Sequence, residues 1–192
     1  MMDWDIASIG HSNNKIEEFI EKLEHHGITA VADVRSVPYS SRMPWFCRDT
    51  IKASLSSRGI SYVWMGEQLG GRPSIPELLT STRRADYVAM AREPSFRKGL
   101  DRLIDGSMKY RVTMMCSEAD PMQCHRCLLV GRSLSNMKIR ISHILKSCDM
   151  ISQEDVEKIL LNKYSKKIIK EDLDSAYAFQ AERHAFHAKL LT

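Results

Sequence analysis

The sequence predicts an α/β fold, with a mostly parallel sheet of five strands or slightly more and helices on both faces. Short apolar runs of strand length recur along the 192 residues, and segments of helix length separate them. No internal repeat or low-complexity run interrupts this alternation. Strands that alternate with helices form βαβ units, whose right-handed crossovers bring parallel strands into one sheet. The expected strands are residues 6–9, 28–34, 60–65, 111–115 and 139–145.

Helices are expected between and after these strands. Asn14 and Glu17 have the spacing of a capping box, and apolar residues then recur on one helical face. Gly27 would end this helix, and Asp49 would cap a second one that stops before Gly59. The segment GEQLGG after the third strand is expected to be a flexible loop. The remaining helices are expected within residues 83–105, with a break near Pro94, and over 124–136, 152–162 and 172–189.

Composition is that of a globular protein, with 43% hydrophobic and 27% charged residues. We expect residues 1–192 to form a single α/β domain, with 150–192 as its C-terminal helical extension. The two terminal helices would pack on this domain, and their apolar positions would either cover the sheet or form a homodimer. The formal net charge of +4 permits anionic partners. Acidic residues are interspersed with the basic ones, so nucleic acid is a permitted partner but not the favoured one.

The sequence also bears on cellular location. No stretch reaches the roughly 20 apolar residues that span a bilayer, and the N-terminus lacks the basic-then-apolar pattern of a signal peptide. Five cysteines, three of them close together, do not suit a secreted disulfide framework. We therefore expect a cytoplasmic protein that does not interact with membranes and needs no cofactor.

Polar side chains follow the expected strands where each strand ends. The carboxyl ends of parallel strands share one edge of an open sheet, and ligands bind at that edge. Asp33 and Arg35 adjoin an apolar run, where a charge requires a partner or a function. Loops are polar in any protein, which is the simpler explanation for the other positions. The residues that the sequence places at this edge are His11, Ser12, Asn13, Asp33, Arg35, Ser36, Glu67, Gln68, Gly70, Gly71, Cys116, Ser117 and Glu118.

The cysteines allow several interpretations. Cys116, at a strand end that faces a helix N-terminus, has the setting of a nucleophilic or redox-active thiol, or of a small buried apolar residue. Cys124 and Cys127 form a CxxC at a helix start, as in thiol oxidoreductases. A zinc site from these three cysteines and a histidine is a further alternative, although one CxxC without a second cysteine pair is weak evidence.

Charged and aromatic residues indicate other roles at the same edge. Arg126 near a helix start, together with Arg35 and Arg42, offers planar guanidinium groups suited to phosphate or carboxylate. His11 and Glu118 have the chemistry of a general acid and base. Trp45 and Phe46 could stack on a nucleic-acid base.

The order of the segments IGHSN, DVRSVPYSSRMPWF, GEQLGG and MCSEADPMQCHR resembles the domain of unknown function 488 family. The resemblance extends from about residue 6 to residue 187, and DLDSAYAFQAERHAFH resembles the closing helix of that family. Its most specific part is the signature Cys-x-Glu…Pro-x-x-Cys-His-Arg, and Cys127 is not part of it. The resemblance supplies no reaction, but it implies that these residues form one constellation: His11, Asn13, Asp33, Arg35, Arg42, Cys116, Glu118, Cys124, His125 and Arg126.

Three hypotheses about function follow. The first is an enzyme, or an enzyme-like protein, that binds a small anionic, phosphate-bearing and nucleotide-like ligand at the carboxyl edge of the sheet. The second is a nucleic-acid-associated binding module without turnover, and the third is a cysteine-based redox or zinc protein. Under the first, the expected catalytic residues are Cys116, Glu118, His11 and Asp33. The expected ligand-binding residues are Asn13, Arg35, Arg42, Cys124, His125 and Arg126, and no metal is expected.

Overall fold

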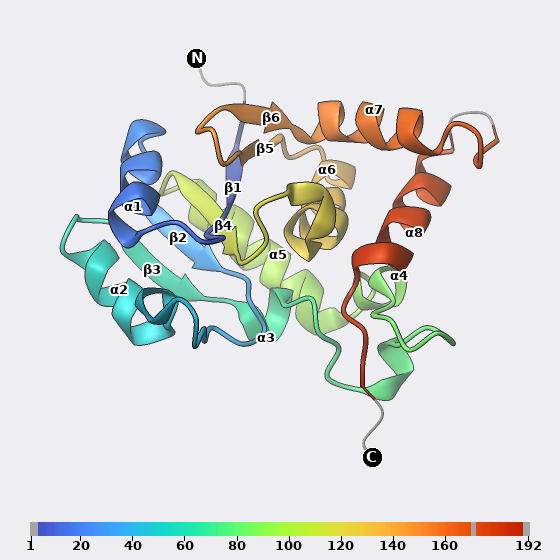
Figure 1. Ribbon diagram of the computed structural model, residues 1–192, viewed down its shortest axis with the longest axis horizontal. Coiled ribbons are helices and arrows are strands. Elements are labelled where there is room, and N and C mark those ends of the chain that lie inside the picture. Colours follow the sequence, from blue (N-terminus) through green and yellow to red (C-terminus); the bar gives the residue numbers. More distant parts are fainter. Residues whose placement is uncertain (1–3, 170–171, 190–192) are drawn as a thin grey trace.

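A six-stranded sheet forms the centre of the protein, whose computed structural model describes residues 4–169 and 172–189 (Figure 1). The strand order is β3-β2-β4-β1-β5-β6, and every neighbouring pair is parallel except β5 and β6. The predicted α/β fold with a mostly parallel sheet is therefore confirmed. The strands are β1 (Ile6–Gly10), β2 (Ala30–Asp33), β3 (Ser61–Trp64), β4 (Val112–Cys116), β5 (Ile141–Ile144) and β6 (Met150–Ser152).

Helices cover both faces of this sheet. Side chains alternate between the faces along each strand, so both faces carry apolar side chains that pack against helices. Val31 of β2 packs in the cluster formed with α1 and α2, whereas Ala30 and Ala32 face the cluster formed with α5. The α-helices are α1 (Ile16–His25), α2 (Arg48–Ser56), α3 (Gly66–Leu69), α4 (Tyr87–Met90), α5 (Pro94–Ser107), α6 (Arg132–Asn136), α7 (Gln153–Tyr164) and α8 (Leu173–His184). Short 3₁₀ turns are η1 (Pro44–Phe46), η2 (Pro76–Leu78) and η3 (Pro121–Gln123).

The two terminal helices pack against the segment that follows the cysteines. Leu160 of α7 and Ala176 of α8 are fully buried in a third apolar cluster, together with Cys127 and Leu128. Ile159 and Phe179, in contrast, remain 42% and 39% exposed. None of the helices in the described parts of the chain combines the length and apolar character needed to cross a bilayer.

Several helix boundaries differ from the sequence prediction. Helix α1 begins one residue later than expected, because Glu18 rather than Glu17 accepts the backbone N–H of the residue before the helix, Lys15. Helix α8 ends at His184 instead of residue 189. The chain beyond it is extended, and the Ala85 N–H donates to the Phe186 carbonyl over 2.8 Å.

Two segments have a different structure from the one expected. The GEQLGG segment is not a flexible loop, because it contains the helical turn α3. The helix expected over 124–136 begins as the π-helical segment η4 (Arg126–Gly131) and continues as α6. Single turns of π-helix are frequent at functional sites. Strand β6 was not predicted, and its short length and its position at the sheet edge give it only a weak sequence signal.

Candidate functional site

Two cysteines, a glutamate and a histidine meet just beyond the carboxyl end of β4. The Cys116 thiol donates to Glu118 Oε2 over 3.0 Å, and Cys124 Sγ lies 3.0 Å from the same oxygen. His125 Nδ1 lies 3.7 Å from Cys116 Sγ and 3.8 Å from Cys124 Sγ. We call these four residues the cysteine cluster. Side chains from a strand end, a turn and a helix start therefore converge on one point.

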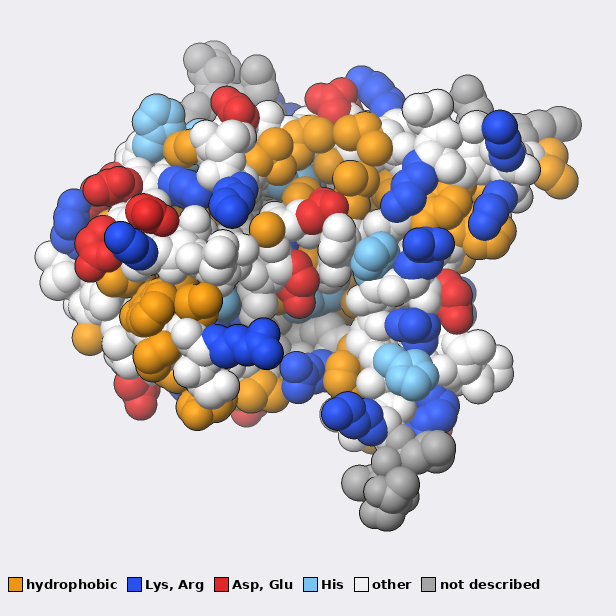
Figure 2. Space-filling model, in the orientation of Figure 1, with side chains coloured by type: hydrophobic (Ala, Val, Ile, Leu, Met, Phe, Trp, Pro, Cys, Tyr) orange, Lys and Arg blue, Asp and Glu red, His pale blue; other side chains and the backbone are white. Residues whose placement is uncertain are grey.

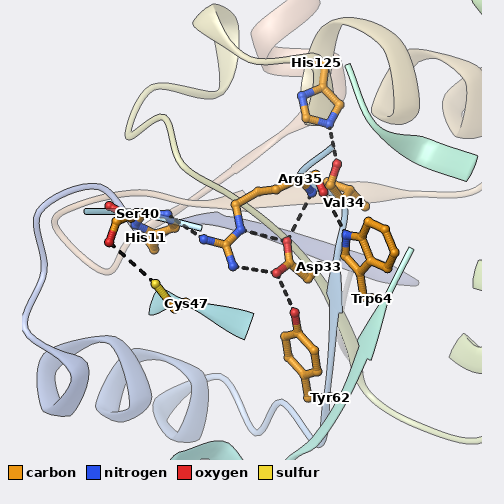
Figure 3. Close-up of polar contacts among 9 residues, drawn as sticks. All are labelled: His11, Asp33, Val34, Arg35, Ser40, Cys47, Tyr62, Trp64 and His125. Atoms are coloured by element: carbon orange, nitrogen blue, oxygen red, sulfur yellow. Dashed lines mark hydrogen bonds and ion pairs between the residues drawn. The ribbon is translucent and has the colours of Figure 1, made fainter. Parts of the chain in front are cut away.

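The ring of His125 is fixed by its second nitrogen. His125 Nε2 lies 2.9 Å from the carbonyl oxygen of Val34, at the end of β2, so this nitrogen carries the hydrogen (Figure 3). The other ring nitrogen, Nδ1, consequently directs its lone pair at the two sulfur atoms when the ring is neutral. Gly71 forms the wall on the other side of the ring. A Cβ atom at Gly71 would lie 2.5 Å from His125 Cγ, so only glycine permits this packing.

The two thiols of the cluster differ in how readily they ionise. Burial opposes ionisation of Cys124, but the adjacent Cys116 thiol and the charge of Arg126 lower the pKa of Cys124 well below its ordinary value. The backbone N–H of Arg126 also donates to Cys124 Sγ over 3.4 Å. The interaction with Cys124 and burial raise the pKa of Cys116. The sequence indicated Cys116 as the nucleophile, whereas this geometry favours Cys124 as the thiolate.

Cys127 does not belong to the cluster, although it forms the CxxC with Cys124. Its side chain is fully buried in the apolar cluster of α7 and α8, and burial raises its pKa to about 12. Among the described residues, the donor atoms of Cys116, Cys124 and His125 lie within 4.8 Å of one another, and Cys127 is not in this group. All five cysteines are free. The CxxC motif is therefore not a dithiol pair in this structure.

Arg126 lies beneath the cluster and is completely buried. Its guanidinium group donates to Ser8 Oγ over 3.2 Å, to the Glu118 carbonyl over 2.6 Å and to the Ala119 carbonyl over 3.0 Å. This group is not exposed in the structure, so the anion-binding role expected for Arg126 gains no support and stays a prediction. Its contacts instead hold the turn that carries Glu118.

Arg35 and Asp33 form a buried ion pair at the end of β2. Arg35 Nη2 lies 2.6 Å from Asp33 Oδ2, and the Tyr62 hydroxyl donates to the same oxygen over 2.7 Å. Figure 3 shows Arg35 folded over the carboxylate, with Tyr62 on its far side. The Asp33 side chain is 0% exposed and is engaged by these donors. It therefore fixes Arg35, and the catalytic role expected for Asp33 stays a prediction.

The backbone N–H of His11 donates to the Cys116 carbonyl over 2.8 Å, but the His11 ring contacts other residues. Its ring stacks on Phe46 at a centroid distance of 4.2 Å, and its Nε2 lies 3.2 Å from Arg35 Nη1. Burial, together with the nearby Arg35 charge, lowers the pKa of His11 to about 4. Because Phe46 is fully buried, it cannot stack on a nucleic-acid base as the sequence suggested. His11 thus packs as a neutral ring in this structure, and its role as a proton carrier stays a prediction.

A cavity of about 160 Å³, which we call the strand-edge pocket, opens beside the cysteine cluster. The predicted site residues Arg35, Cys116, Glu118, Cys124 and His125 contribute to its lining. The other predicted residues, His11, Asn13, Asp33, Arg42 and Arg126, do not. Asn13 and Arg42 are exposed elsewhere on the surface.

Two basic residues of the pocket were not predicted from the sequence. Arg72 follows Gly71 directly, and His184 is the last residue of α8. Figure 2 shows Lys and Arg side chains gathered over α8 and the chain that follows it, beside a hollow in the centre of this face. A basic residue after a glycine pair is too common to have signalled a site. A larger cavity of about 610 Å³ between α4, α6 and α8 includes none of the predicted residues.

A second polar network, which we call the buried polar chain, lies on the same face of the sheet. His143 of β5 contacts Ser8 Oγ through Nδ1 over 2.6 Å and Gln153 Oε1 through Nε2 over 2.7 Å. Gln153 in turn donates to the Tyr177 hydroxyl. The only sequence signal was a histidine inside the apolar run ISHIL.

The family model described as Domain of unknown function DUF488 matches residues 15–132. The chain belongs to the DUF488 family. This match includes the whole Cys-x-Glu…Cys-His-Arg signature, but it is shorter than the resemblance expected over residues 6–187. His11, Asn13 and the C-terminal helices lie outside it. No curated protein and no solved structure matches this DUF488 chain.

Proposed function

We propose that this DUF488 protein binds a small anionic, phosphate-bearing ligand in the strand-edge pocket, as an enzyme or an enzyme-like binding protein. One observation carries the proposal: thiol, carboxyl and imidazole groups share a single pocket with a guanidinium group at its mouth. Such a combination provides both charge recognition and groups that exchange protons.

Arg72 is the best candidate for the recognition of the anion. It is exposed, its guanidinium lies 5.2 Å from the centroid of the Phe186 ring, and it makes no ion pair with a described residue. Arg35, in contrast, already has its charge balanced by Asp33. The role expected for Arg35 and Arg126 therefore passes to Arg72.

The size of the pocket limits what it encloses. Ligand sites for drug-sized molecules commonly measure about 300–1,000 Å³, and this cavity of about 160 Å³ is smaller. A phosphate group fits inside, while the rest of a nucleotide-like ligand would extend over the basic surface near α8. Glu118 and the two thiols would then lie beside the enclosed group.

The proposal extends to location. A reducing compartment such as the cytoplasm suits the cysteine cluster, because Cys116 and Cys124 both remain free thiols close to each other.

A thermal-shift screen tests the proposal with inorganic phosphate, nucleotides, phosphosugars and short oligonucleotides. A ligand at about 100 times its dissociation constant stabilises the folded state by about 2.7 kcal/mol. We expect one small phosphorylated class to raise Tm, and Arg72→Ala to abolish the rise. Arg48→Ala is the matched control, because Arg48 is also exposed and lies over an aromatic ring, that of Trp64, outside the pocket.

Three results would contradict the proposal. A shift that survives Arg72→Ala would place the ligand elsewhere, and a salt-sensitive shift with oligonucleotides alone would favour the nucleic-acid-binding module. A disulfide between Cys116 and Cys124 that forms under mild oxidation and restores on reduction would favour the redox protein.

A further inference from the structure

The cysteine cluster has the donor atoms of a metal site. We infer that Cys116, Cys124 and His125 bind a divalent transition-metal ion of the zinc class, with the fourth position left to an external ligand and Glu118 beside it. Thiolate sulfur and imidazole nitrogen are the ligands that zinc prefers in proteins. The sequence suggested Cys116, Cys124, Cys127 and a histidine as a zinc set, and the structure retains all of these donors except Cys127.

The distances agree with a single bound ion. Zinc bonds of about 2.3 Å to sulfur and about 2.0 Å to nitrogen, at tetrahedral angles, separate sulfur from nitrogen by about 3.5 Å. The observed separations from His125 Nδ1 are 3.7 Å to Cys116 Sγ and 3.8 Å to Cys124 Sγ. All three donor atoms lie within 4.8 Å of one another. One ion can therefore contact all three with only small side-chain adjustments.

The surroundings of the donors provide independent support. A histidine that binds a metal commonly donates its other ring N–H to a carbonyl or a carboxylate, which fixes the ring. His125 Nε2 has this partner in the Val34 carbonyl, and Gly71 leaves room for the ring only in its present place. The backbone N–H of Arg126 points at Cys124 Sγ, as amides do around metal-bound thiolates.

The charge balance also favours a cation. Cys116, Cys124 and Glu118 each become negative on losing a proton, and both sulfur atoms lie 3.0 Å from one carboxylate oxygen. Arg126 beneath them donates to carbonyl and hydroxyl oxygens, and Arg35 is paired with Asp33. A divalent ion supplies positive charge at the point where the three acidic groups meet.

A second group of potential ligands lacks these features. His25, His26 and Cys148 also bring donor atoms within 4.8 Å, but none of the three is buried. His26 Nε2 already lies 2.8 Å from the Cys148 carbonyl. This nitrogen is thus engaged by the backbone, and the group serves as a useful comparison rather than as a second site.

The inferred metal site does not require the proposed anion. A role of the metal in ligand recognition does require it. If the proposed function holds, the ion lies at the floor of the strand-edge pocket, and its fourth position faces the bound anion. A phosphate oxygen would take that position, and Glu118, 3.0 Å from both sulfur atoms, would lie beside it as a proton acceptor. The inference in this form rests on the proposed function and names the group that recognises the ligand.

Metal titration of the purified full-length protein, after treatment with a chelator, tests the site. We expect one equivalent of Zn²⁺ to bind, and one equivalent of Co²⁺ to give the intense charge-transfer absorption of cobalt–thiolate bonds. Cys124→Ser should abolish that absorption, and His125→Gln should weaken the affinity at least tenfold. Cys127→Ser is the matched control, a buried thiol three residues away that should leave the spectrum unchanged.

X-ray absorption on the zinc-loaded wild-type protein tests the site without any substitution, so its result does not depend on whether the variants fold. We expect sulfur neighbours at about 2.3 Å together with nitrogen or oxygen neighbours at about 2.0 Å. Only nitrogen and oxygen neighbours, no uptake of one equivalent, or equal loss in Cys124→Ser and Cys127→Ser would overturn the inference.

Inorganic phosphate separates the two proposals. A cobalt spectrum that changes on addition of phosphate supports both. Uptake of one equivalent of cobalt with a spectrum indifferent to phosphate and to the other screened anions keeps the metal site and counts against the proposed function. Stabilisation by phosphate in protein that binds no metal would support the proposed function and overturn the metal site.

Discussion

The cysteine cluster and the buried polar chain each contain a buried histidine, and the two histidines differ in how many of their ring nitrogens have a hydrogen-bond partner. His143 has a protein partner on each ring nitrogen, Ser8 Oγ on one side and Gln153 Oε1 on the other. His125 has a firm partner on one nitrogen only, and its second nitrogen faces two sulfur atoms at 3.7 Å and 3.8 Å. Both side chains are buried. Burial alone therefore does not distinguish a structural histidine from a chemical one, whereas the list of partners does.

Arg126 connects the two regions. Its Nε donates to Ser8 of the polar chain, and its terminal nitrogens donate to the carbonyls of the turn that carries Glu118. Its backbone N–H reaches Cys124 of the cluster. Arg126 thus supplies a hydrogen bond to the buried polar chain and also holds the turn and the thiol of the cysteine cluster in place.

Replacement of Arg126 should have the largest effect. Arg126→Ala leaves the Glu118 and Ala119 carbonyls without their donor and opens a cavity where the largest fully buried side chain stood. Loss of a buried, hydrogen-bonded charge should lower the free energy of unfolding by at least about 3 kcal/mol. Urea denaturation measures this change.

Arg72→Ala is the matched control for this prediction. Arg72 is exposed at the mouth of the pocket, so its loss should change the free energy of unfolding by less than about 1 kcal/mol. Equal effects of the two substitutions would mean that Arg126 is accessible, and would restore it as an anion-binding residue.

Between pH 6.5 and 5 a smaller effect should come from acid pH, through His143 of the buried polar chain. Burial, then the Arg126 charge, lowers the pKa of His143 to about 3, from an ordinary value near 6.5 in the unfolded chain. Between these values only the unfolded state takes up the proton. The free energy of unfolding should therefore fall as pH decreases from about 6.5 towards 3, by up to about 1.4 kcal/mol per pH unit.

His143→Gln isolates this contribution, because glutamine cannot titrate. We expect the variant to be less stable than the wild type at pH 7, and its stability to decline less steeply between pH 6.5 and 5. Denaturation curves at several pH values measure both slopes. Parallel slopes would show that His143 takes up its proton in the folded state and that the polar chain is not closed.

The fold followed from the sequence because the sheet leaves a strong local pattern. Each parallel strand is an apolar run, and helix-length amphipathic segments connect the runs, so the strands and the shared carboxyl edge could be predicted. The errors occurred where a local pattern was overridden by distant contacts. Glycines of GEQLGG indicated a flexible loop, yet a Cβ at Gly66 would lie 1.9 Å from the Arg35 carbonyl. Close packing, not flexibility, requires glycine there.

The site was predictable only in outline. Placement after strand ends identified Cys116, Glu118 and Arg35 as residues of one edge, and the pocket does contain them. The sequence could not show which charges neutralise each other, because ion pairing and burial depend on side-chain positions. Asp33 and Arg126 therefore looked chemically available and are instead fully engaged. Arg72 and His184 gave no local signal, because both reach the pocket from distant segments.

The smallest expected effect concerns a buried hydroxyl that has no partner. Thr113 of β4 is fully buried, and its Oγ1 makes no hydrogen bond with any residue the structure describes. Thr113→Val removes this uncompensated polar atom with little change of shape, so the free energy of unfolding should stay constant or rise by up to about 1 kcal/mol. Ser8→Ala is the matched control on the neighbouring strand, because it removes a hydroxyl with partners and should cost about 1–3 kcal/mol. Thermal and urea denaturation of the two variants compare these opposite signs. If Thr113→Val lowered the free energy of unfolding as much as Ser8→Ala, the Thr113 hydroxyl would have a partner after all. The number of hydrogen-bond partners in the structure would then not predict the effect of removing a buried polar group.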